Sequence, residues 1–85
     1  MEFLVYAVKD ELTGVFYAPM YFKTEVEAAR YFKTQMNNTP NCKYNASDYA
    51  IYKLGTFNEE TGVFTSNVSK EIGGRSVIDV NNSKE

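Results

Sequence analysis

Two pairs of adjacent carboxylates, Asp10–Glu11 and Glu59–Glu60, are the side chains of this sequence best suited to acid–base chemistry. Paired carboxylates can hydrolyse glycosides, one as the acid and the other as nucleophile or base. Both pairs lie in polar, turn-forming segments, where acidic side chains are ordinarily solvated. The sequence has no histidine, so the Ser–His and Cys–His nucleophile pairs are missing too. We therefore predict a protein that binds and does not catalyse.

The sequence also offers no site for a metal ion or a nucleotide cofactor. Cys42 is its single cysteine, so an internal disulfide and a zinc site of the usual nitrogen and sulfur ligands are both excluded. Neither the G-x-G-x-x-G nor the G-x-x-x-x-G-K phosphate-binding pattern occurs. There is no apolar run of about 20 residues and no basic signal at the N-terminus. We expect an intracellular protein without cofactors in a reducing compartment.

Aromatic and basic residues alternate between Lys23 and Lys53, a composition that suits single-stranded nucleic acid. Rings on a sheet stack bases for about 1–3 kcal/mol each, while cations contact phosphates. The net charge of −2 argues against binding dominated by phosphates and against tight duplex binding. Alternatively, the rings belong to the core or to a dimer contact, and the lysines to the solvated surface. The predicted contacts are Tyr17 and Tyr49, by stacking, and Arg30, Lys33 and Lys53, at phosphates.

The hydrophobic pattern predicts two β-hairpins. Residues 3–8 and 15–22, and then 49–57 and 63–65, are rich in β-formers and are separated by polar turns. Residues 10–16 and 58–64 read D-E-L-T-G-V-F and N-E-E-T-G-V-F, which indicates either two similar hairpins or convergent turn chemistry. Gly14 can adopt the positive φ that such a loop requires. Pro19 lacks an N–H, so the second strand should lie at an edge or be bulged there.

A helix is predicted between the hairpins. Thr24 and Glu27 form a capping box at its start, and the polar segment 37–40 ends it. Residues 37–48 form a long polar connection to the third strand. The apolar stripe of the helix consists of Val26, Ala29, Phe32 and Met36.

Alternation along the strands divides their side chains between the two faces of the sheet. The face away from the helix is too apolar to be left wholly to water, so we expect a partner to cover it. The helix side should hold Leu4, Tyr6, Val8, Phe16, Ala18, Met20, Phe22, Ala50, Tyr52 and Leu54. The opposite face should hold Phe3, Val5, Ala7, Val15, Tyr17, Tyr21, Tyr49, Ile51 and Lys53.

These elements predict an α+β fold, with an antiparallel four-stranded sheet of two hairpins and one helix between them in the order β-β-α-β-β. Residues 1–65 should form the single domain, and residues 66–85 a C-terminal tail that is partly flexible. Residues 76–80 are a candidate for a short fifth strand.

Several segments resemble a viral family in their order and spacing. They are F-L-V-Y-A-V-K-D at 3–10, A-P-M-Y-F at 18–22, A-A-R-Y-F at 28–32, and D-Y-A-I-Y-K-L-G at 48–55 followed by F-N and T-G. Together they resemble the small non-structural protein of gokushovirus-type microviruses, which are phages with single-stranded DNA genomes. The resemblance implies a non-enzymatic protein of the infected cell, absent from the mature virion and labelled as DNA-binding.

Two functions of different classes are consistent with these observations. The first is a phage protein that associates with single-stranded DNA in the host cytoplasm, during genome replication or the switch to packaged-strand synthesis. The second is a homodimeric interaction module that uses the outer sheet face and engages a phage or host replication or assembly protein. Neither function requires a cofactor or a membrane.

Overall fold

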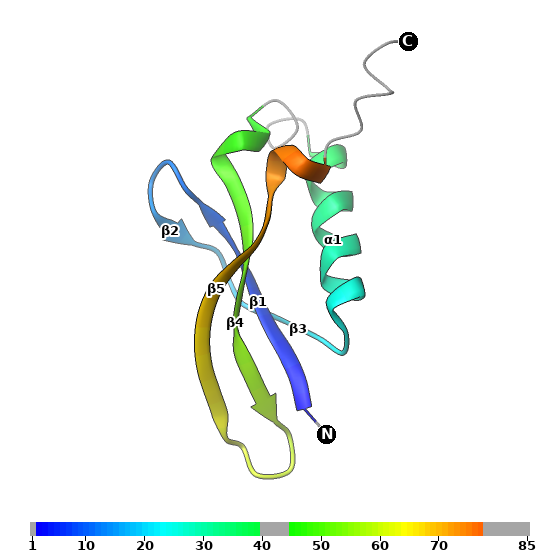
Figure 1. Cartoon of the computed structure of the whole chain (residues 1–85), viewed down its shortest axis with the longest axis vertical. Coiled ribbons are helices and arrows are strands. Elements are labelled where there is room, and N and C mark those ends of the chain that lie inside the picture. Colours follow the sequence, from blue (N-terminus) through cyan, green and yellow to red (C-terminus); the bar gives the residue numbers. More distant parts are fainter. Residues whose placement is uncertain (1, 40–44, 78–85) are drawn as a thin grey trace.

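The computed structural model, which describes residues 2–39 and 45–77, contains an antiparallel sheet with a helix along one side of it (Figure 1). The α+β class is thereby confirmed, although the second predicted strand is divided into two, which gives five strands. β1 lies between β4 and the short strands β2 and β3, and β5 forms the other edge. The elements are β1 (Glu2–Asp10), β2 (Val15–Phe16), β3 (Met20–Phe22), α1 (Glu25–Asn38), η1 (Ala46–Asp48), β4 (Tyr49–Asn58), β5 (Phe64–Gly73) and η2 (Gly74–Val77), where η denotes a 3-10 helix.

The interruption between β2 and β3 coincides with Pro19, as predicted. Lys9 of β1 pairs with Phe16, and Tyr6 pairs with Met20. The segment between these pairs is one residue longer on the edge strand than on β1, so the edge strand is bulged there. Because an extra residue reverses alternation, Phe16 lies on the face opposite α1, which corrects its predicted place on the helix side.

The two hairpin turns have the same geometry. The side chains of Asp10 and Asn58 each accept hydrogen bonds at 2.9–3.3 Å from the backbone N–H groups two and three residues ahead. Gly14 and Gly62 donate to the backbone carbonyls of those same residues at 2.7 and 2.8 Å, and both have positive φ, at 79° and 77°. The similarity seen in the sequence is therefore a similarity of local structure, in which glycine avoids the strain of the left-handed region.

The helix begins at the predicted cap. The Thr24 hydroxyl accepts a hydrogen bond from the N–H of Glu27 at 3.2 Å, and the Glu27 carboxylate accepts one from the N–H of Lys23 at 3.0 Å. The carboxylate therefore reaches one residue further back than in an ordinary capping box. Two unpaired donors near the helix start are satisfied in this way.

The apolar stripe of α1 differs in phase from the predicted one. Ala28, Phe32 and Met36 are its buried residues, at the four-residue spacing that places side chains one above another. Val26 is 65% exposed and Ala29 is only half-buried. The prediction was wrong for Val26, because alanine at 28 gives little hydrophobic signal in a sequence yet allows the helix to approach the sheet closely.

The core lies between α1 and the helix side of the sheet. Tyr6 and Phe22 pack edge to face with their ring centroids 5.9 Å apart, and Phe22 also contacts Tyr31 at 5.7 Å. Full burial of one such aromatic side chain contributes about 1.5–3 kcal/mol. The central cluster consists of Tyr6, Val8, Ala28, Phe32, Met36 and Ile51.

The third predicted strand, β4, faces the opposite way from the prediction over residues 49–53. Val8 pairs with Ile51, and both belong to the core cluster. Tyr52 pairs with Ala7 and so lies on the other face. The register shifts by one residue at Leu54, where a bulge in β4 reverses the alternation. Tyr49 and Ile51 are therefore helix-side residues, while Ala50 and Tyr52 are not.

β5 is much longer than the predicted fourth strand, running from Phe64 to Gly73 instead of 63–65. The region predicted as a tail from residue 66 thus begins with residues paired to β4. Most side chains of β5 are exposed. A strand exposed on both faces does not need alternating apolar residues, so the sequence contains no signal for it. Residues 76–77 of the predicted fifth strand lie in η2, and residues 78–80 lie outside the described part of the chain. The β4–β5 hairpin extends well past the start of α1 (Figure 1).

Candidate nucleic-acid interface

A cluster of aromatic rings occupies the sheet face opposite α1, which we call the outer face. Phe3 of β1 pairs with Phe57 of β4, and Val5 pairs with Tyr21 of β3, so these side chains share that face. The Tyr21 ring lies 6.4 Å from that of Phe3 and 6.0 Å from that of Phe57. Tyr21 is 63% exposed. Three elements of the sheet thus present adjacent rings to solvent.

A second aromatic pair lies further along the outer face. The rings of Phe16 and Tyr52 meet edge to face at 5.4 Å. The ammonium nitrogen of Lys9 lies 5.2 Å from each ring centroid, within the range of a cation–π interaction. Lys70 of β5 pairs with Tyr52 and brings a second cation to the same region. The outer face therefore combines aromatic rings with two lysines.

Glu11 links these groups from the first hairpin turn. Its carboxylate accepts hydrogen bonds from the Tyr52 hydroxyl at 2.6 Å and from the Lys70 ammonium at 3.1 Å. The hydrogen bond from Tyr52, and then that from Lys70, lowers the pKa of Glu11, while the same bond to Glu11 raises the pKa of Tyr52. The network fixes the orientation of the Tyr52 ring and offsets one positive charge of the outer face.

The carboxylate pairs that were considered for catalysis are involved in local structure. Asp10 accepts turn N–H groups, and Glu11 binds Tyr52 and Lys70. Glu59 and Glu60 lie exposed in the second turn. In the described part of the chain there is no group of three or more His, Cys, Asp or Glu side chains arranged to hold a metal ion. Cys42 lies outside that part.

Two of the predicted contacts, Tyr17 and Tyr49, converge on one cavity. The cavity has a volume of about 490 Å³ and lies between the broken edge strand and α1, on the helix side. Tyr31 of α1 lines it as well. These rings therefore come together, but away from the outer face. The lining residues are Val8, Tyr17, Ala18, Met20, Tyr31, Gln35, Met36, Thr39 and Tyr49.

The three predicted phosphate contacts are dispersed. Arg30 and Lys33 are exposed on α1. Lys53 pairs with the core residue Tyr6, which places it on the helix side of β4. The structure thus brings none of the five predicted residues to the outer face.

Sequence reasoning missed the residues that do gather on the outer face. Phe3 and Tyr21 were assigned to that face by alternation but were not selected as contacts. The pairing of Phe57 with Phe3 depends on a long-range register that local alternation does not reveal. The missed residues are Phe3, Lys9, Phe16, Tyr21, Tyr52, Phe57 and Lys70.

Comparison with known proteins identifies the family of the chain. A family model described as "Phage ORF5 protein" matches residues 3–80. No curated protein and no solved structure matches significantly. Among the described residues, no helix is sufficiently long and apolar to cross a membrane. The match confirms that the resemblance to a phage protein was correct at this level. Because it extends over nearly the whole sequence, the chain belongs to the Phage ORF5 protein family.

Proposed function

We propose that the protein binds single-stranded DNA through the outer face and catalyses no reaction. The observation that carries this proposal is the grouping of Phe3, Tyr21 and Phe57 on one exposed face, next to a second ring pair with Lys9 between its members. Sheets that present aromatic rings stack unpaired bases, while neighbouring cations meet the phosphates. A base in a duplex offers no such free ring face.

The charges of the outer face predict binding dominated by stacking. Lys9 and Lys70 supply two cations there, and Glu11 offsets one of them. Each phosphate contact to a single strand contributes about −0.7 to the slope of log K against log salt. Two contacts are therefore the upper limit, and they give a slope of about −1.4, or about a sevenfold loss of affinity between roughly 50 and 200 mM salt. We therefore expect a weak salt dependence, as the net charge of −2 also suggests.

Fluorescence anisotropy with labelled single-stranded oligonucleotides at both salt concentrations tests the proposal. Tyr21→Ala should weaken binding by about 1–3 kcal/mol, the value of one stacked base. Tyr17→Ala is the matched control, because Tyr17 is 51% exposed but lies by the helix-side cavity. Absence of binding at low salt contradicts the proposal. An equal loss in Tyr17→Ala excludes the outer face as the contact surface.

The biological setting of the proposal follows from the family and from the resemblance. Membership of a phage family supports a role in the infected cell, and the segments that resemble the microvirus protein support a single-stranded DNA genome. We place the protein in the host cytoplasm and outside the mature virion. It acts there in genome replication or in the switch to packaged-strand synthesis. Detection of the protein in purified virions by mass spectrometry would contradict this placement.

A second candidate is a homodimeric module that engages a replication or assembly protein of the phage or host. It is supported by exposed apolar side chains on β5, where Phe64 and Val68 are 46% and 56% exposed. Phe64 pairs with Phe57, so it extends the aromatic cluster to the edge of the sheet. Analytical ultracentrifugation distinguishes the two candidates. A protein that stays monomeric at high concentration has no dimer interface on this surface.

A further inference from the structure

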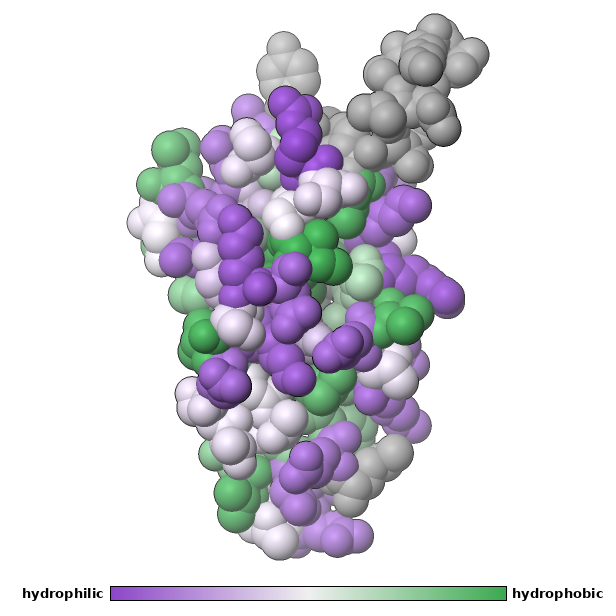
Figure 2. Space-filling view, in the orientation of Figure 1, coloured by the Kyte–Doolittle hydropathy of each residue, from purple (hydrophilic) through white to green (hydrophobic). Residues whose placement is uncertain are grey.

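A second cavity on the side of the sheet that faces α1 has two carboxylates among its lining residues. It has a volume of about 230 Å³ and lies between β5 and the start of the helix. In Figure 2, hydrophobic surface is visible between β5 and α1, bordered by hydrophilic side chains. The lining residues are Tyr6, Glu25, Val26, Ala28, Ala29, Ile51, Glu71 and Ile72.

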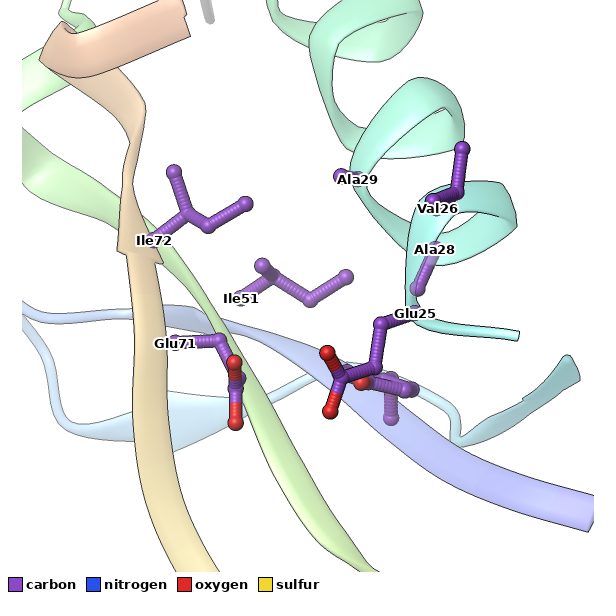
Figure 3. Close-up of a pocket in the computed structure, with 8 residues that line it drawn as sticks. Glu25, Val26, Ala28, Ala29, Ile51, Glu71 and Ile72 are labelled. Carbon is purple, nitrogen blue, oxygen red and sulfur yellow. The ribbon is translucent and has the colours of Figure 1, made fainter.

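Two carboxylates and one hydroxyl are the polar side chains of this cavity. Figure 3 shows Glu25, from the first turn of α1, and Glu71, from β5, directed toward the same space. Tyr6 is only 2% exposed and lines the cavity from β1. Within the described residues, neither carboxylate has an ion-pair or hydrogen-bonding partner, and neither does the Tyr6 hydroxyl. No fully enclosed side-chain polar atom of the described residues lacks a partner, so the unpaired Tyr6 hydroxyl opens onto the cavity, where a ligand can bond to it.

The two carboxylates give the cavity negative charge, and the Tyr6 hydroxyl lies near them. Burial, and then the charges of Glu71 and Glu25, raise the pKa of Tyr6 to about 12. The hydroxyl therefore remains protonated, and it is close enough to both carboxylates to respond to them. A cation between Glu25 and Glu71 would be attracted by two negative charges that face a shared space.

The rest of the lining is apolar. Ile51 is fully buried at the floor of the cavity, and Ile72 and Val26 flank it. A magnesium ion requires near-octahedral oxygen ligation and retains several waters, which these aliphatic side chains do not favour. They suit methylene groups instead.

We propose that this cavity binds a primary alkylammonium group, with its nitrogen between Glu25 and Glu71 and its methylene chain against Ile51 and Ile72. An ammonium has three N–H donors, and the cavity has three acceptor groups, the two carboxylates and the Tyr6 hydroxyl oxygen. The ligand is either a free aliphatic diamine or the end of a lysine side chain from another protein. This site is independent of the outer face and of DNA binding.

NMR titration of the full-length protein with n-butylamine, 1,4-diaminobutane and Nα-acetyl-lysine methylamide, at constant ionic strength, tests the proposal. We expect saturable shifts of the amides of Glu25, Glu71 and Ile72 with n-butylamine. Shifts with the diamine but not the lysine derivative assign the site to a free diamine, and equal shifts with the lysine derivative admit a protein side chain. Absence of a saturable shift with all three overturns the proposal.

Charge and shape are tested with matched variants. Glu71→Gln should weaken n-butylamine binding about tenfold, the value of one charge-assisted hydrogen bond. Tyr6→Phe, which keeps the ring, should weaken it by a smaller factor. Glu59→Gln removes the same charge in the exposed second turn and should have no effect. An equal loss in Glu59→Gln, equal binding of n-butanol, or displacement of the amine by the same concentration of magnesium overturns the proposal.

Discussion

The Tyr52 hydroxyl lies 2.6 Å from a carboxylate oxygen of Glu11, so a residue of the first hairpin turn is bonded to the middle of β4. The other oxygen of the same carboxylate binds Lys70 of β5 at 3.1 Å. One side chain thus connects the turn with two strands of the second hairpin.

Replacing Glu11 with Gln should destabilise the protein at pH 7 and have much less effect in acid. The folded state lowers the pKa of Glu11 from its ordinary value of 4.5. Its contribution is therefore present above that value and is lost as the pH falls through the lower folded value. Urea unfolding of both proteins at about pH 7 and pH 3 measures this, with Glu59→Gln as the control. A stability difference that does not change with pH would rule out an ionised Glu11 as the source.

Replacing Gly14 with Ala should lower the free energy of unfolding by about 1–2 kcal/mol, because an alanine pays for the left-handed conformation. A Cβ at Gly14 meets no atom within 4 Å, so the cost is that of the backbone alone. Gly14→Asn should cost less, since asparagine tolerates positive φ. Gly62→Ala should match Gly14→Ala, because their φ angles are 77° and 79°. Clearly different losses in urea unfolding would show that the two turns are not equivalent.

Replacing Phe32 with Ala should cost about 3–5 kcal/mol, as a large buried ring leaves a cavity. Phe32 is fully buried at the centre of the core cluster. Val26→Ala is the matched control on the same helix and should change stability by less than about 0.5 kcal/mol, because Val26 is mostly exposed. Thermal unfolding of the two variants tests the phase of α1. A larger loss of stability for Val26→Ala would instead support the apolar stripe predicted from the sequence.

Replacing Tyr6 with Phe should have little effect at pH 7 and should protect the protein in alkali. Tyr6 has an ordinary pKa of 10.0 that is raised to about 12 in the fold. The neutral hydroxyl is the form that the folded state favours, so its contribution is present below pH 10 and is lost between pH 10 and 12. We expect Tyr6→Phe to gain stability relative to the parent protein from about pH 10 to 12. A difference in the free energy of unfolding between the two proteins that stays constant throughout that range would contradict the raised pKa.

Local chemistry in the sequence was sufficient for the elements that depend on it. The cap at Thr24, the turn glycine at 14 and the interruption at Pro19 each follow from what one or two neighbouring residues can do. Alternation in β1 correctly assigned Tyr6 and Val8 to the helix side, because that strand is central and its two faces differ in what covers them.

The outer face could not be assembled in the same way. Bulges near Pro19 and at Leu54 each add a residue and reverse the alternation beyond it. A bulge of this kind is set by pairing between distant segments, so the sequence of a single strand does not locate it. Phe16 and Tyr52 were consequently assigned to the helix side, although they are the ring pair beside Lys9.

The unequal edges of the sheet limit how copies of this chain can assemble by strand addition. On one side, Pro19 and the bulge interrupt the row of backbone donors and acceptors that a further strand requires. On the other side, β5 leaves a ten-residue row unpaired within the described chain. Strand addition through β5 therefore stops at two chains. Both outer edges of the joined sheet are then the edges interrupted by Pro19 and the bulge. This arrangement disfavours the open-ended strand addition that builds fibres.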